Sequence, residues 1–194
     1  MQTTFPRLML KHAAERPTAP ALREKEYGIW QTTSWSDLAR LVQSVACGLH
    51  QAGLQRGEHL IVVGSNRPRL YATMLAAQSL GAIPVPLYQD AAAAECVFPI
   101  TNAEVRFAVV EDQEQVDKML EVREQCPQLT HIYYDDPRGL REYTEDGLGS
   151  LEELIAAGGV FAQQHPQFFS EEVEKAVYTD VAAMFFTSGT TGNP

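Results

Sequence analysis

Length, composition and charge limit the classes of protein to which this chain can belong. The chain has 194 residues, of which 45% are hydrophobic and 21% charged, so it can form a folded core and is unlike a disordered chain. Its net charge is −10, and 13 acidic against 4 basic residues lie between Glu111 and Glu153. Nucleic-acid binding needs basic patches, so this regional acidity argues against a nucleic-acid partner and favours a solvated acidic face.

The spacing of cysteine and histidine gives no sign of a disulfide framework or a zinc site. Cys47, Cys96 and Cys126 lie far apart, and the five histidines show no His-x-x-x-His spacing. Arg7 and Lys11 interrupt the mildly apolar N-terminus, which predicts no signal peptide. No apolar run approaches the ~20 residues that span a bilayer. We therefore expect a cytoplasmic protein without a transmembrane segment and leave peripheral membrane association open.

The first elements are a helix and a β-hairpin. Pro6 suits the first turn of a helix, and Pro17 ends it. Residues 19–24 and 29–33 are rich in strand formers and flank a turn that contains Gly28. This pattern predicts two antiparallel strands.

Helices and strands then alternate. Ser34 and Asp37 have the spacing of a capping box and begin a long amphipathic helix. An apolar strand is predicted over 59–64 and a helix with a buried stripe over 68–80. The two prolines within 83–87 predict a short strand near a sheet edge, because proline lacks the N–H that a central strand needs.

The middle of the chain continues the alternation. Helices are predicted over 91–102 and 111–125, and strands over 105–110 and 130–134. Pro99 is expected to kink or end the first of these helices. Residues 135–149 are polar and contain a proline and three glycines, which indicates a surface excursion.

The last predicted elements are two short helices and a strand. We expect a helix over 151–157 that Gly158 and Gly159 stop, a helix over 171–176 capped by Ser170, and a buried strand over 181–186. Strands that alternate with helices predict an α/β fold with a mainly parallel sheet flanked by helices, preceded by the small amino-terminal hairpin. Ligands of such sheets bind beyond the carboxyl ends of the strands.

A loop of hydroxyls and glycines follows the last predicted strand. Glycines let the backbone approach a ligand closely, and successive backbone N–H groups can wrap an anion such as phosphate. A plain surface turn is the alternative on composition alone. The Walker A ending Gly-Lys-Ser/Thr is absent, and Phe186 breaks a Gly-x-Ser-x-Gly hydrolase motif. The residues of this hydroxyl loop are Thr187, Ser188, Gly189, Thr190, Thr191 and Gly192.

Several stretches resemble one enzyme family. FFTSGTTGNP resembles the phosphate-loop motif of the adenylate-forming (AMP-binding) enzymes, which include acyl-CoA synthetases, luciferases and peptide-synthetase adenylation domains. The segments TSWSDLARLVQSVACGLHQAGLQRGEHLIVVGSN and AAQSLGAIPVPLY resemble the first and second core regions of that family. PLYQDAAAAE and HIYYDDPRGLREYTEDGLGSLEELIAAG are most similar to bacterial long-chain fatty acyl-CoA synthetases.

The resemblance implies a function and a domain assignment. Residues 1–194 would be the amino-terminal fragment of the AMP-binding large domain of a long-chain fatty acid–CoA ligase and would end inside the phosphate-loop motif. By the same resemblance, Thr187 to Gly192 would cradle the phosphates of ATP while Mg²⁺ bridges them. Fatty acid, ATP and CoA would be the substrates.

The resemblance also implies what the fragment lacks. The lysine that usually follows the motif is absent, and no residue of the chain is a credible general base or nucleophile. We therefore expect residues 1–194 alone to be inactive and to self-associate through apolar surface. A ligase of the same superfamily for another carboxylic acid, and a non-catalytic module that binds nucleotide or a partner, stay open as alternatives.

Overall fold

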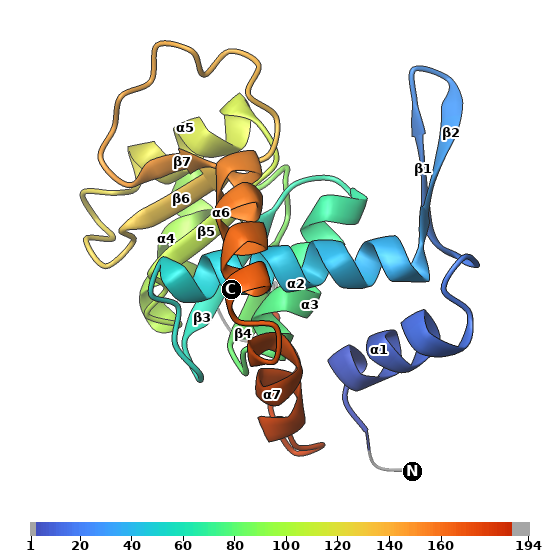
Figure 1. The fold of residues 1–194 in the computed structure, drawn as a ribbon. Helices are drawn as coiled ribbons and strands as arrows, with labels where there is room; N and C mark the ends of the chain where they lie inside the picture. Colours follow the sequence, from blue (N-terminus) through green and yellow to red (C-terminus); the bar gives the residue numbers. More distant parts are fainter. Residues whose placement is uncertain (1–2, 188–194) are drawn as a thin grey trace.

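The protein folds as a parallel sheet between two layers of helices, with a separate two-stranded hairpin (Figure 1). The structure is a computed structural model and describes residues 3–187. The strands are β1 (Pro20–Glu26), β2 (Ile29–Ser34), β3 (His59–Val63), β4 (Ile83–Leu87), β5 (Phe107–Val110), β6 (His131–Tyr134) and β7 (Leu148–Ser150). The helices are α1 (Phe5–Glu15), α2 (Trp35–Gln51), α3 (Pro68–Ser79), α4 (Ala93–Asn102), α5 (Gln113–Glu121), α6 (Leu151–Gln164) and α7 (Phe168–Lys175).

The five-stranded sheet has the order β4-β3-β5-β6-β7, and all its neighbours are parallel. Successive side chains of a strand point to opposite faces, so each central strand contributes to two cores. Leu60 and Val62 of β3 lie in the core beneath α2, α3 and α6, whereas Ile61 and Val63 lie in the core beneath α4 and α5. The predicted α/β fold with a mainly parallel sheet is therefore confirmed.

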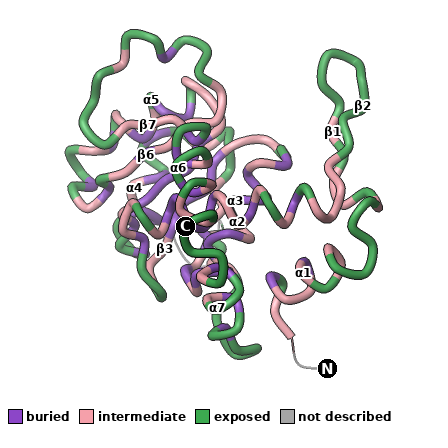
Figure 2. The backbone as a smooth tube through the Cα atoms, in the orientation of Figure 1, coloured by how far each residue is buried: buried purple, intermediate pink, exposed green. Residues whose placement is uncertain are grey.

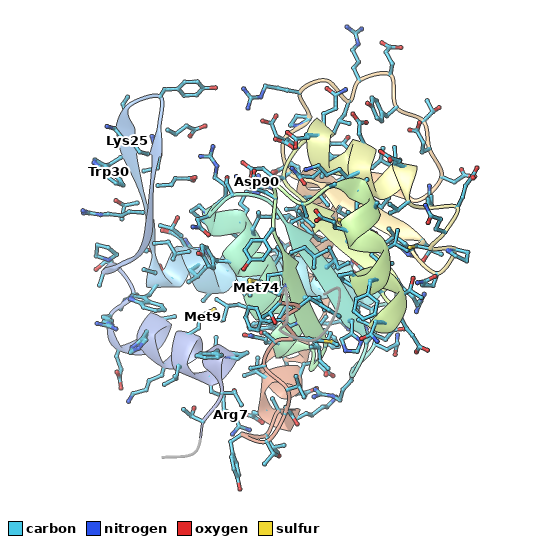
Figure 3. All side chains as sticks on the ribbon, turned by 180° about the vertical axis from the view of Figure 1, so that it is seen from behind. Arg7, Met9, Lys25, Trp30, Met74 and Asp90 are labelled. Carbon is cyan, nitrogen blue, oxygen red and sulfur yellow. The ribbon has the colours of Figure 1, made fainter. Side chains whose placement is uncertain are left out.

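The hairpin β1–β2 stands apart from the sheet and carries mostly exposed residues (Figures 1 and 2). Lys25 and Trp30 are cross-strand partners near its tip (Figure 3). At its base, Ser34 accepts a hydrogen bond from the Asp37 amide and forms the predicted capping box of α2. The hairpin and the capped helix are both confirmed.

The crossing of α2 and α6 corrects a predicted helix end. Helix α6 does not stop at Gly158 and Gly159 but continues to Gln164. A Cβ atom on Gly158 would lie 1.9 Å from the Ser44 carbonyl oxygen and 2.5 Å from the Gly48 nitrogen. Glycine is therefore needed here for close contact between two helix backbones, and this contact outweighs its weak helix propensity.

Three smaller expectations are also corrected. Of the two effects expected of Pro99, the end of the helix is wrong: Pro99 lies inside α4, and the Ala103 amide donates to the Pro99 carbonyl in the following turn. Ser170 does not cap α7, which begins at Phe168. Its hydroxyl donates to the Gln167 carbonyl, 2.8 Å away, while Phe169 is buried in the core. The excursion over 135–149 leads into β7, an additional edge strand.

No helix within residues 3–187 has the length and apolar character required to cross a membrane. Mostly apolar side chains line a groove of about 540 Å³ between α1, α2, α3 and the base of the hairpin. Met9 of α1 and Met74 of α3 both line this groove (Figure 3).

Candidate functional site

The segment that leads into the hydroxyl loop lies beside the outer edge of β4. The Met184 amide donates to the Pro84 carbonyl oxygen at 3.0 Å. Met184 and Phe186 pack against the core beneath α4 and α5, and the ring of Phe186 meets that of Phe98 edge-on, with centroids 5.8 Å apart. These contacts place residues 181–187 next to the last strand on this side of the sheet.

The prediction of a buried strand over 181–186 is wrong for this structure. Residues 181–187 form no strand, and Val181 and Phe185 are 57% and 68% exposed. The cause is the edge that it meets: β4 carries Pro84 and Pro86, which have no N–H to donate to a neighbouring strand. The sequence correctly placed these prolines at a sheet edge.

The structure describes only the first residue of the predicted phosphate cradle. Thr187 is exposed and lies at the end of the segment beside β4. Ser188, Gly189, Thr190, Thr191 and Gly192 lie outside the described residues, so the cradle stays a prediction.

A cluster of charged residues lies at the carboxyl end of the sheet. Glu111, directly after β5, accepts hydrogen bonds from the backbone amide and the hydroxyl of Ser65, two residues after the end of β3. Arg67 lies 3.3 Å from Glu111 and 3.4 Å from Glu24 of the hairpin. Partial burial raises the pKa of Glu111, but the hydrogen bonds from Ser65 and Arg67 outweigh burial and lower the pKa below its ordinary value. Glu111 was missed as a candidate site residue, although it directly follows the strand predicted over 105–110.

A second carboxylate in this cluster has the opposite shift. Burial raises the pKa of Asp135, and the guanidinium of Arg69, 2.9 Å away, only partly offsets it. Together with residues of the hairpin tip, these side chains line an open groove of about 650 Å³. The ion pairs tie the hairpin and α3 to the sheet, so the cluster has a clear structural role.

The described residues offer little for metal or thiol chemistry. No group of three or more His, Cys, Asp or Glu side chains within residues 3–187 is arranged to hold a metal ion. All three cysteines are buried, and burial raises the pKa of the Cys47 thiol to about 11. Such a thiol is protonated at neutral pH and is a poor nucleophile. All three cysteines are core residues.

Comparisons with known proteins connect this fold to one enzyme family. A model of the family "AMP-binding enzyme" matches residues 9–194. The chain is 22% identical over 187 residues to Long-chain-fatty-acid--CoA ligase FadD15 of Mycobacterium bovis, a match that covers 96% of this chain and 29% of the relative. It is 28% identical over 177 residues to Long-chain-fatty-acid--CoA ligase ACSBG2 of Xenopus laevis, with 90% and 23% covered.

Solved structures share the fold. The anthranilate CoA ligase AuaEII in complex with anthranoyl-AMP superimposes with a TM-score of 0.79 at 20% identity, over 97% of this chain and 33% of that one. Acetoacetyl-CoA synthetase from Streptomyces lividans gives a TM-score of 0.76 at 21% identity, over 100% of this chain and 29% of that one. The chain spans 29% of the length of the FadD15 relative and 23% of that of ACSBG2.

Proposed function

Because this chain belongs to the AMP-binding enzyme family, we propose that it is the amino-terminal part of an ATP-dependent long-chain fatty acid–CoA ligase. The observation that carries the proposal is the family match over residues 9–194, which includes the whole hydroxyl loop. The two sequence relatives described above are both named long-chain-fatty-acid–CoA ligases, which favours a long acyl chain as substrate.

The proposed reaction has two steps. The fatty acid carboxylate attacks the α-phosphorus of ATP, so that an acyl–AMP anhydride forms and pyrophosphate leaves. The thiolate of CoA then attacks the acyl carbon, a thioester forms and AMP leaves. The first step transfers the adenylyl group to the carboxylate, and the second transfers the acyl group to the thiolate. In both, the protein contributes mainly by positioning the charged groups and stabilising their charge.

The hydroxyl loop suits the first step. We propose that backbone N–H groups and threonine hydroxyls of residues 187–192 hold the β- and γ-phosphates of ATP. Mg²⁺ would add positive charge between these phosphate oxygens. The loop contains no carboxylate, and residues 3–187 form no metal-binding cluster, so this part of the chain fits a metal that arrives with the nucleotide. Thr187, which begins the loop, is exposed and so accessible to a ligand.

A ligase for a different carboxylic acid is the second candidate. The two structural neighbours described above are named for anthranilate and acetoacetate, and their fold matches this chain over nearly its whole length. Chemistry at the phosphates would be the same in either case. Only the acid would differ.

ATP–pyrophosphate exchange by the whole protein distinguishes these candidates. With Mg-ATP and either palmitate, anthranilate or acetoacetate, we expect exchange to be fastest with palmitate. Faster exchange with a small acid would replace the long-chain assignment, and no exchange with any acid would favour a non-catalytic module. Residues 1–194 alone serve as the control and are expected to give no exchange, because most of the length of the relatives has no counterpart in them.

A further inference from the structure

The outer edge of β4 can accept hydrogen bonds but not donate them at two successive positions. In a parallel strand, the N–H and the C=O of one residue point to the same side, and the side alternates along the strand. The Ile83 amide donates to the Glu58 carbonyl at the start of β3, 2.8 Å away, so Ile83 and Val85 face β3. Residues 84 and 86 therefore face the outer edge, and both are prolines.

The segment after α7 runs along this edge in the direction of β4. Ala182 lines a small cavity with Gly81 and Ala82, which lie just before β4, and two residues later Met184 bonds to Pro84. In a parallel ladder the amide of residue 84 would donate to the Ala182 carbonyl, and that of residue 86 to the Met184 carbonyl. Neither bond can form. Among residues 181–187, the Met184 amide is the only one with a partner in the part of the chain that the structure describes.

A side chain donates to the first of these two carbonyls. Gln78, in the last turn of α3, extends its amide to the Ala182 carbonyl, with Nε2 2.6 Å from the oxygen. Its Oε1 is buried and has no hydrogen-bond partner among the described residues. The opposite orientation of the amide would set two oxygen acceptors against each other, so the Ala182 carbonyl fixes Nε2 as the group that faces it.

We propose that Gln78 is a positioning residue that replaces the backbone donor absent at Pro84 and so holds residues 181–187 on the edge of the sheet. Thr187 is the last of these residues and the first of the hydroxyl loop, so Gln78 sets where that loop begins. The consequence for catalysis rests on the proposed function, in which the loop binds the phosphates of ATP. The structural part of the inference does not.

Hydrogen exchange in the whole protein tests the structural part. Gln78→Met keeps the length of the side chain and removes the donor. We expect the Met184 amide to exchange about 5- to 10-fold faster, as for loss of a hydrogen bond of about 1 kcal/mol. Gln51→Met is the matched control: Gln51 is exposed at the end of α2, and its substitution should leave this exchange unchanged.

Restoring an N–H at residue 84 shows whether Gln78 acts through its hydrogen bond or through packing. Pro84→Ala gives residue 84 an N–H that can donate to the Ala182 carbonyl. In the Gln78→Met background it should return exchange of Met184 to within about 2-fold of the parent protein, because one donor replaces the other. Pro84→Val is used if the alanine variant does not fold. Unchanged exchange in Gln78→Met, or no recovery in either double variant, would overturn the proposal.

Adenylation kinetics test the consequence for the loop. We expect kcat/KM for Mg-ATP to fall about 5- to 10-fold in Gln78→Met and to recover with Pro84→Ala, a recovery that a packing role would not produce. If the parent protein adenylates no acid, the proposed function fails while the exchange data still decide the role of Gln78. A third outcome is possible when the parent protein is active. If Gln78→Met speeds exchange of the Met184 amide but leaves kcat/KM unchanged, then Gln78 holds residues 181–187 without positioning the loop.

Discussion

Two backbone segments meet at the crossing of α2 and α6 and again at the outer edge of β4. The first meeting depends on a missing side chain, and the second is limited by missing hydrogen-bond donors. At the crossing, Gly158 has no side chain, so the backbones of α2 and α6 are in direct contact. A larger residue at this position would clash with the backbone of α2. At the edge, Pro84 and Pro86 remove hydrogen-bond donors, so the adjoining segment is held by the Met184 amide and the Gln78 side chain. The first contact stabilises the fold, whereas the second holds residues 181–187 at the sheet edge through two hydrogen bonds.

The largest loss of folding stability is expected at the crossing. Gly158→Ala places a methyl group against backbone atoms that belong to two packed helices and cannot move independently. We expect a loss of about 2–3 kcal/mol in the free energy of unfolding by urea, which is typical of an overpacked core.

The neighbouring glycine provides the matched control. A Cβ atom on Gly159 would lie 3.7 Å from the Ser44 hydroxyl oxygen, an ordinary contact. Gly159→Ala should therefore stabilise the protein by up to about 1 kcal/mol, because alanine favours a helix. Equal effects of the two substitutions would mean that the crossing is not limited by backbone contact.

An intermediate loss is expected at the charged cluster that ties the hairpin to the sheet. The pKa of Glu111 in the folded state lies below its unfolded value, so this carboxylate stabilises the fold above about pH 4.3. That contribution is lost as the pH falls through the folded-state pKa. We expect Glu111→Gln to cost about 1–2 kcal/mol at pH 7, since it replaces charged hydrogen bonds from Ser65 and Arg67 with neutral ones.

Urea unfolding at several pH values checks this expectation. The difference between the parent protein and Glu111→Gln should shrink as the pH falls below about 4.3 and through the folded-state pKa of Glu111. Glu114→Gln is the control: this side chain is 69% exposed in its pair with Lys118, so the substitution should cost less than about 0.5 kcal/mol. A difference independent of pH would show that the charge of Glu111 contributes nothing.

The two regions also differ in how far their structure could be predicted from the sequence. Hydrophobic periodicity and the Ser34 capping box located most helices and strands, because these signals act within a few residues. The end of α6 was misplaced because glycine as a helix stop and glycine as a contact surface look the same in the sequence; only the approach of Ser44 distinguishes them.

The candidate site was predictable in part for the same reason. Pro84 and Pro86 indicated an edge strand, but nothing local showed that 181–186 would lie along that edge and bond to it through the Met184 amide. The link between Gln78 and Ala182 spans 104 positions of the sequence, and the short strand β7 forms only because β6 offers it a partner. The phosphate-binding role of the hydroxyl loop stays a prediction from its sequence motif, because Ser188 to Gly192 lie outside the described residues.

The most direct test of the central claim is made on the hydroxyl loop, where the smallest loss of stability is expected. Thr191→Val in the whole protein keeps the side-chain shape and deletes the hydroxyl. We predict that single-turnover formation of acyl-AMP from palmitate falls about 10- to 150-fold, because a hydrogen bond to a charged phosphate contributes about 1.5–3 kcal/mol. The free energy of unfolding, measured by thermal unfolding without ligand, should change by no more than about 0.5 kcal/mol. Unchanged adenylation together with a stability loss of several kcal/mol would show that the loop is a structural turn and would contradict the account.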